Sequence, residues 1–139
     1  MREAAENAGV SLDYEGGDPE PTGMMWNTFA AHKLLTWAGE EHGPQRQTAL
    51  KLALFRAHFN HRRALGDDAV LLDIAEEEGF DRTAARAALA SEELAHKVRA
   101  EERAAWDLNI TGVPAMVVEN KFMIPGAQPA EAYADALRR

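Results

Sequence analysis

The sequence predicts an α/β fold in which a long helical segment separates a first strand from a later pair of strands. Three observations support this prediction. Residues 27–107 follow a helical pattern almost throughout, an apolar run rich in β-branched residues follows at Ala115–Val118, and a further helical pattern closes the chain from Pro129. A chain of 139 residues, 46% of them hydrophobic, is long enough for one domain with a substantial core.

Composition excludes several classes of function. The formal net charge is -8, which disfavours nucleic-acid binding because a phosphate backbone requires a basic face. The apolar stretches are too short to cross a bilayer, and the polar start of the chain is unlike a signal peptide, so we expect a cytoplasmic protein without membrane contact. The sequence contains no cysteine, which excludes disulfides, thiolate metal sites and cysteine nucleophiles within these residues.

The first 26 residues predict the end of a helix, a short strand and a loop. Residues 3–8 have good helix propensity, and Gly9 is placed to terminate that helix. The alternation of apolar and polar residues at 10–14 predicts a strand, and the glycines and prolines of residues 15–23 predict a loop.

Five helices with short connections are predicted between residues 27 and 109. Capping residues mark the starts of these helices, and residues suited to a left-handed backbone conformation mark several of their ends. The predicted starts lie at Asn27 or Thr28, near Gln45, at Asp67 or Asp68, at Asp81 and at Ser91. The predicted ends lie at Gly39 or Gly43, near His61, at Gly79 with Phe80 folding back, at Ala90 and at Asn109.

The apolar residues of these helices predict what each helix buries. The helix at 45–61 carries two adjacent stripes, which predict packing on two sides. These stripes are Leu50, Leu54 and Ala57, and Leu52, Phe55 and Phe59. The helix after Ser91 should bury Leu94, Val98, Ala105 and Trp106. Large aromatic side chains dominate burial, so Trp26, Trp37, Trp106, Phe55 and Phe59 are expected in the core, although they could instead line a groove.

The last thirty residues predict a hairpin and a helix. Ala115–Val118 should be a strand buried on both faces, followed by a turn at 119–121 and a strand at 122–124. Pro129 suits the first position of a helix, whose buried stripe would be Ala132, Tyr133, Ala136 and Leu137.

Ile110-Thr111-Gly112-Val113-Pro114, running directly into an apolar strand, resembles the proline loop of thioredoxin-fold proteins. The helical insert before it resembles that of DsbA-like proteins, and the segment from Asn27 to Leu35 resembles the opening of the insert in their FrnE-like branch. Relatives of that branch include 2-hydroxychromene-2-carboxylate isomerases and kappa-class glutathione transferases. The resemblance implies a thioredoxin-like domain at 1–26 and 110–139 with an all-helical insert at 27–109.

One departure from this family concerns the start of the chain. The family begins with a strand that leads into Cys-x-x-Cys at a helix start, and this sequence shows neither. We therefore expect an N-terminally truncated thioredoxin-like fold. The missing strand would lie beside Ala115–Val118 and would leave backbone groups unpaired, so a homo-oligomer is expected.

The function implied by the resemblance is thiol–disulfide oxidoreduction on a protein thiol or a small thiol substrate. In this family the residue before the proline offers backbone groups to an extended substrate, and the proline bond is cis. Thr111, Val113 and Pro114 are therefore the candidate substrate-binding residues, with His32 and Asn27 near the site. Thiolates carry the disulfide exchange, so the cysteine-free chain by itself should be redox-inert and have no catalytic residue.

Two alternatives remain open. A kappa-type isomerase or transferase would use glutathione, the one cofactor under consideration, with a serine or a single cysteine. A non-catalytic binding module would use the same groove without chemistry. His58 and His61 share a helix face, but no third ligand accompanies them, so no metal site is expected. The run Glu76-Glu77-Glu78 is interpreted as a solvated helix face.

Overall fold

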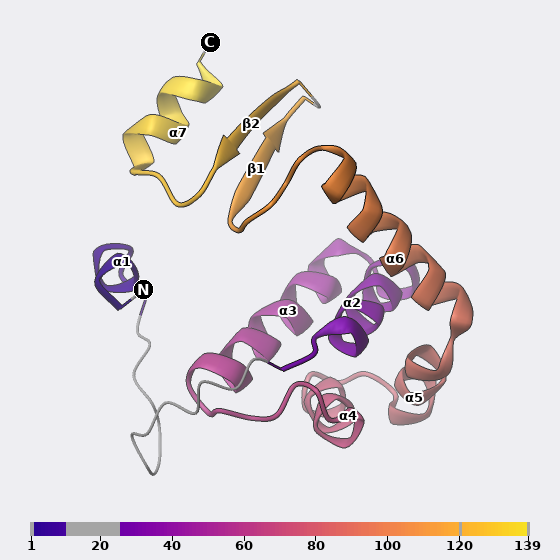
Figure 1. Cartoon of the computed structure of the whole chain (residues 1–139). Coiled ribbons are helices and arrows are strands. Elements are labelled where there is room, and N and C mark those ends of the chain that lie inside the picture. Colours follow the sequence, from indigo (N-terminus) through magenta and orange to yellow (C-terminus); the bar gives the residue numbers. More distant parts are fainter. Residues whose placement is uncertain (1, 11–25, 120, 139) are drawn as a thin grey trace. The chain divides into compact units, whose positions relative to one another are not determined.

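The computed structural model describes residues 2–10, 26–119 and 121–138 (Figure 1). These residues form a mostly helical α/β structure with a small two-stranded sheet. Its elements are α1 (Arg2–Asn7), α2 (Phe29–His42), α3 (Pro44–Phe59), α4 (Asp68–Glu77), α5 (Arg82–Ala90), α6 (Glu92–Asp107), β1 (Ala115–Val118), β2 (Phe122–Pro125) and α7 (Ala130–Leu137). The chain divides into two compact units, Met1–Val98 and Arg99–Arg139, so the division falls within α6.

The predicted helix starts are confirmed where a polar side chain caps them. The Asp67 carboxylate accepts the N–H of Ala69 at 2.8 Å before α4. The Asp81 carboxylate accepts the N–H of Ala84 at 2.7 Å before α5. The Ser91 hydroxyl accepts the N–H of Leu94 at 3.2 Å in the first turn of α6. Each cap satisfies a backbone donor that the helix itself leaves unpaired.

Three helices end in the same left-handed arrangement, as predicted at Gly9, Gly79 and Asn109. The φ angles at these positions are 70°, 80° and 57°. At each end the next residue donates its N–H to a carbonyl five residues earlier, for example Phe80 to Ala75 at 2.9 Å. This paired bonding satisfies the last carbonyls of the helix and turns the chain away from its axis. Phe80 is buried beyond the end of α4, as predicted.

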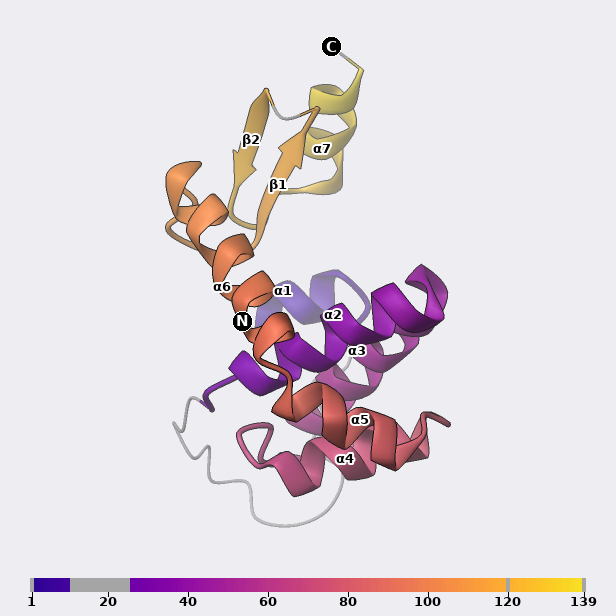
Figure 2. The ribbon, with the colours of Figure 1, turned by 90° about the vertical axis from the view of Figure 1, so that its right-hand side faces the viewer.

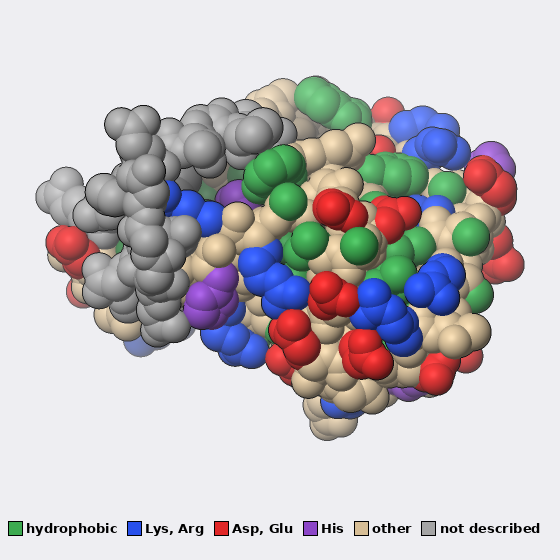
Figure 3. Space-filling view, turned by 90° about the horizontal axis from the view of Figure 1, so that it is seen from below, with side chains coloured by type: hydrophobic (Ala, Val, Ile, Leu, Met, Phe, Trp, Pro, Cys, Tyr) green, Lys and Arg blue, Asp and Glu red, His purple; other side chains and the backbone are tan. Residues whose placement is uncertain are grey.

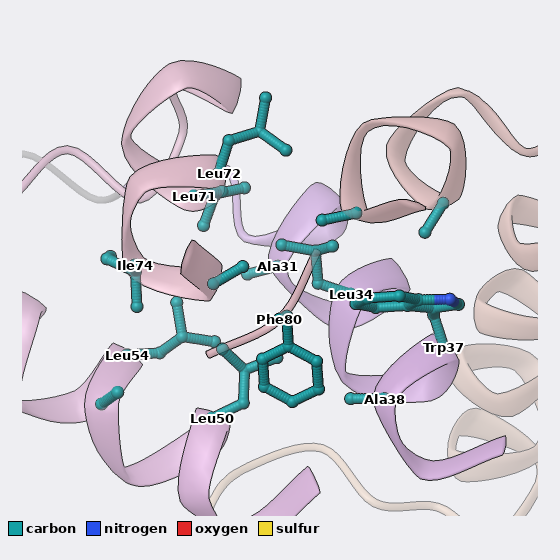
Figure 4. Close-up of a cluster of buried hydrophobic side chains, with 14 of the residues drawn as sticks. Ala31, Leu34, Trp37, Ala38, Leu50, Leu54, Leu71, Leu72, Ile74 and Phe80 are labelled. Atoms are coloured by element: carbon teal, nitrogen blue, oxygen red, sulfur yellow. The ribbon is translucent and has the colours of Figure 1, made fainter. Parts of the chain in front are cut away.

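The hydrophobic core of the first unit lies among α2, α3, α4 and α5. Leu34, Leu50, Leu71 and Ile74 are fully buried there, and Figure 4 shows their side chains converging. Burying one such side chain contributes roughly 1.5–3 kcal/mol. Trp37 belongs to this core and Trp26 packs against it, which confirms the prediction for these two aromatics.

Two of the predicted buried surfaces are wrong. One stripe of α3 is buried, but Leu52, Phe55 and Phe59 are 49%, 51% and 40% exposed. In α6, Leu94 and Val98 are buried while Trp106 is 66% exposed. The physical reason is that helical spacing fixes which side chains share a face, whereas burial requires a second surface to cover that face.

The second unit contains the antiparallel hairpin β1–β2 and the helix α7 beside it (Figure 2). Met116 pairs with Ile124 and Val118 with Phe122, so these four side chains share one face. Ala115, Val117, Met123 and Pro125 share the other face. The prediction that β1 is buried on both faces is wrong, since Met116 is 41% and Val117 37% exposed. In the described residues β1 pairs with β2 alone, and a two-stranded sheet offers little burial.

The final helix is also less buried than predicted. Tyr133 is half-buried, but Ala132, Ala136 and Leu137 are exposed, since the described residues bring little surface against α7. Pro129 precedes α7 as its N-cap residue instead of occupying its first turn.

Ion pairs cover part of the surface of the first unit. Each glutamate of the run 76–78 faces an arginine: Glu76 lies 2.9 Å from Arg82, Glu77 2.8 Å from Arg63 and Glu78 3.4 Å from Arg56. Figure 3 shows acidic and basic side chains intermingled on the face seen from below. Such exposed pairs contribute little stability individually, so this is a solvated surface.

The predicted strand at 10–14 lies outside the described residues except for Val10, which follows the end of α1 and is exposed. The predicted loop at 15–23 lies wholly outside them. Within the described ranges, every helix is too short or too polar to cross a bilayer.

Candidate functional site

The candidate site is the loop between α6 and β1. The left-handed Asn109 ends α6, with its N–H donating to Trp106 at 2.8 Å and the N–H of Ile110 donating to Ala105 at 3.0 Å. Asparagine tolerates this conformation because its short polar side chain relieves the steric cost. The chain therefore leaves α6 sharply at Ile110 and enters β1 at Ala115.

Three predicted site residues come together in this loop. Thr111, Val113 and Pro114 are all exposed, and Val113 is 91% exposed. The Val113–Pro114 peptide bond is cis. An exposed apolar side chain and exposed backbone in a short loop present a surface that a ligand can contact.

The loop is anchored at its far end to the second strand. The carbonyl oxygen of Pro114 accepts the N–H of Gly126 at 2.8 Å, which extends the hairpin ladder by one pair beyond β1 and β2. A hollow of about 180 Å³ opens beside this anchor. It is lined by residues 109–113 together with Ala115, Met123, Pro125 and Gly126.

A second set of hydrogen bonds holds the turn after β2, which contributes Pro125 and Gly126 to the lining of this hollow. The N–H of Gln128 donates to the Tyr133 hydroxyl at 3.2 Å, and that hydroxyl donates to the Gly126 carbonyl at 3.2 Å. The side-chain amide of Gln128 donates to the Pro125 carbonyl at 2.9 Å. Gln128 and Tyr133 thus fix the turn that supports Pro114.

Sequence reasoning missed this role of Gln128 and Tyr133. Helical spacing places Tyr133 on an apolar stripe, but a tyrosine hydroxyl near an interior also needs a hydrogen-bond partner. The available signal was a tyrosine one turn into a helix that directly follows the Pro-Gly-Ala-Gln-Pro turn.

The described lining of this hollow is uncharged. None of its described lining residues has an ionisable side chain, and Thr111 supplies a hydroxyl. The sequence has no cysteine to act as a nucleophile. The described residues also hold no group of three His, Asp or Glu side chains suited to a metal ion. The ring of His58 instead lies 4.6 Å from that of Phe59, centre to centre.

The two remaining predicted site residues belong to the first unit. Asn27 is exposed, and its side-chain oxygen accepts the N–H of Phe29 at 3.0 Å, so it satisfies a backbone donor at the start of α2. His32 is exposed on the first turn of α2. Both side chains are accessible to a ligand.

A larger hollow of about 510 Å³ lies between the hairpin and α7. Its lining is apolar except for Asp135 and includes Val118, Phe122 and Ile124 from the hairpin. It contains none of the predicted site residues.

Comparison with known proteins identifies the family. The sequence matches the DSBA-like thioredoxin domain over residues 1–138. The structure is similar to the crystal structure of a probable DsbA oxidoreductase from Streptomyces coelicolor, with a TM-score of 0.78 and 36% sequence identity. That match covers 96% of this chain and 54% of the other chain. No curated protein matches the sequence.

The chain therefore belongs to the family of DsbA-like thioredoxin domains. This confirms the predicted fold class, a thioredoxin-like α/β fold dominated by helices. The chain spans about half the length of the Streptomyces protein that it resembles.

Proposed function

We propose that this chain provides the substrate-binding part of a thiol–disulfide oxidoreductase of the FrnE-like branch. In this proposal an extended thiol or disulfide substrate lies along Thr111, Val113 and Pro114. The observation that carries it is the exposure of this loop, with Val113 91% exposed, beside a hollow whose described lining has no charge.

The anchoring of the loop at Pro114 supports a binding role. Pro114 is tied to Gly126 by a backbone hydrogen bond, and the Tyr133 hydroxyl holds the Gly126 carbonyl in turn. A loop fixed before binding loses less conformational entropy when a substrate orders against it. An extended peptide can then use the backbone N–H and C=O of Val113 as strand-like hydrogen-bonding groups.

The redox step itself needs sulfur that these residues lack. Disulfide exchange proceeds by attack of a thiolate on a disulfide, and the sequence contains no cysteine. We propose that the reactive sulfurs come from a polypeptide segment outside the 139 residues. His32 and Asn27, both exposed, are proposed as further contacts on the substrate side.

A binding experiment tests the role of the loop. An extended peptide with a blocked, S-methylated cysteine is titrated into isotope-labelled protein, and the amide signals are followed by NMR. We expect shifts at Thr111, Gly112 and Val113, and none at Lys121. No change in the loop signals at millimolar peptide would contradict the proposal.

Two variants of the same residue sharpen this test. Val113→Pro removes the backbone donor, and we expect it to weaken peptide binding about fivefold, because a hydrogen bond contributes about 1 kcal/mol net. Val113→Ala keeps the donor and shortens only the side chain, so it should weaken binding less than Val113→Pro does. The ladder amides of Met116 and Val118 report whether the hairpin remains folded in both variants.

Two further measurements separate this proposal from its alternatives. The chain should not accelerate the reduction of insulin disulfides by dithiothreitol. Clear turnover would refute the proposal that the reactive sulfurs lie outside these 139 residues. Specific binding of glutathione to the same loop, measured by calorimetry, would instead favour the kappa-type isomerase or transferase.

A further inference from the structure

Two methionines of the hairpin are equally exposed but lie on opposite faces of it. Met116 on β1 and Met123 on β2 are each 41% exposed. Met116 pairs with Ile124, and Met123 pairs with Val117, so the alternation of side chains along the paired strands places the two thioethers on different faces. This pair allows the effect of position to be separated from the effect of exposure.

Met123 lines the hollow of about 180 Å³ beside the proline loop. Thr111 and Val113 of the loop line the same hollow. Met116 does not belong to its described lining and shares the other face with Ile124, which lines the larger hollow between the hairpin and α7. Met123 is therefore the hairpin methionine that a ligand in the smaller hollow contacts.

The position of Met123 does not depend on the strand expected beside Ala115–Val118. A strand added at the free edge of β1 would be separated from Met123 by β1 itself. The described lining of the hollow comes wholly from residues 109–126, which belong to one compact unit. The place of Met123 beside the loop is therefore set within this unit.

Sulfur chemistry distinguishes Met123 from the rest of this hollow. The other described lining side chains are aliphatic, hydroxyl or amide groups, which dilute peroxide leaves unchanged. A thioether sulfur attacks one oxygen of hydrogen peroxide, so that a sulfur–oxygen bond forms and the oxygen–oxygen bond breaks. The sulfur loses two electrons, and the departing oxygen takes the proton of the transferred oxygen and leaves as water. The product is a methionine sulfoxide, which is polar where the thioether was apolar.

We propose that reversible oxidation of Met123 to its sulfoxide by hydrogen peroxide controls substrate binding at the proline loop. This inference rests on the proposed function, since it concerns the same loop. The sulfoxide brings a strong hydrogen-bond acceptor into an uncharged hollow. A substrate that covers this oxygen without donating to it removes a polar group from water at a cost. Oxidation therefore weakens binding, and reduction of the sulfoxide restores it.

Leucine variants of the two methionines test this proposal. Leucine keeps an apolar side chain of similar volume but has no sulfur to oxidise. The unaltered chain, Met123→Leu and Met116→Leu are each treated with dilute hydrogen peroxide, freed of peroxide and titrated with the S-methylated peptide. The sequence has no cysteine, so methionines are the residues that peroxide oxidises first, and peptide mass spectrometry reports which of them carry oxygen.

Each variant is compared with its own untreated form. We expect oxidation to weaken peptide binding about fivefold in the unaltered chain and in Met116→Leu, and to leave the affinity of Met123→Leu unchanged. Methionine sulfoxide reductases, one for each epimer, should restore the affinity of the oxidised unaltered chain.

Three results would overturn this inference alone. They are equal losses of affinity in the two variants, an oxidised chain that binds as well as the untreated one, and a Met123 that stays unoxidised while Met116 is oxidised. An untreated chain that does not bind the peptide would overturn the proposed function and this inference together.

Discussion

The ammonium group of Lys33 on α2 donates a hydrogen bond at 2.5 Å to the carbonyl oxygen of Leu89, near the end of α5. Lys33 is only 7% exposed, yet its charge has this defined partner. The last carbonyls of a helix have no partner within that helix and favour a positive charge. This contact therefore ties α5 to α2 and accounts for a lysine inside the helical unit.

Replacing the buried Lys33 should cost more stability than replacing an exposed lysine. Lys33→Met keeps most of the aliphatic stem but removes the donor to Leu89, and we expect a loss of about 1.5–3 kcal/mol. Urea unfolding followed by circular dichroism measures the change. The exposed Lys51 on α3 supplies the control, since Lys51→Met should change stability by less than about 0.5 kcal/mol. Equal effects at the two positions would contradict this account.

Gly39 marks a close approach between α2 and α3. A Cβ at this position would lie 2.7 Å from the side-chain amide nitrogen of Gln47, which donates to the Leu35 carbonyl at 2.9 Å. Gly39→Ala gains up to about 1 kcal/mol of helix propensity but displaces Gln47, so we expect no net gain. In a Gln47→Ala background the same change should stabilise by about 0.5–1 kcal/mol. A double-mutant cycle measures this coupling, and simple additivity would refute it.

Lys97 gives the stability of the helical unit a defined dependence on alkaline pH. Hydrogen bonds to the carboxylates of Glu40 and Glu93 raise the pKa of Lys97 above its ordinary value. Because the folded state binds this proton more tightly, the stabilisation is fully present below the unfolded-state pKa and is lost as pH rises through the folded-state value.

The prediction for Lys97 is therefore a pH-dependent difference in Tm. Lys97→Met should lower Tm at neutral pH, and the difference from the unaltered chain should shrink as the pH is raised above about 10. Lys97→Arg keeps the charge throughout this range and should show no such convergence. Differential scanning calorimetry checks both variants, and a pH-independent difference for Lys97→Met would count against the electrostatic explanation.

Tyr133 should stabilise the turn below the candidate site. Tyr133→Phe removes the hydroxyl that accepts from Gln128 and donates to Gly126, with an expected loss of about 1–2 kcal/mol in the second unit. Hydrogen exchange at the Gln128 amide should accelerate, while exchange at the ladder amide of Met116 stays slow. Unchanged exchange at Gln128 would show that the hydroxyl bonds do not hold this turn.

Local features of the fold could be predicted from the sequence. Asp81, Gly79 and Asn109 mark helix ends because their own side chains or backbone freedom satisfy neighbouring backbone groups. Coverage of apolar faces could not be predicted in the same way. Phe55 and Trp106 have the spacing of buried residues but are exposed, because burial depends on a second surface that the periodicity of one helix does not specify.

The place of the candidate loop in the chain could be predicted from the sequence, whereas its role in binding stays a prediction. Thr111, Val113 and Pro114 are adjacent in sequence, so the loop that holds them together follows from local signals. The supporting bonds from Gln128 and Tyr133 depend on how α7 returns to the hairpin. No local pattern in a single sequence predicts how α7 returns to the hairpin.

The bond between Gln128 and Pro125 limits how far strands can add to this sheet. A hairpin with two usable edges could recruit copies without end and grow into a ribbon. Here the outward carbonyl of Pro125 on β2 is already occupied by a side chain of the same molecule, and Pro125 has no N–H, so this edge offers few groups to an added strand. Gln128 therefore protects the outer edge of β2 from pairing with another strand.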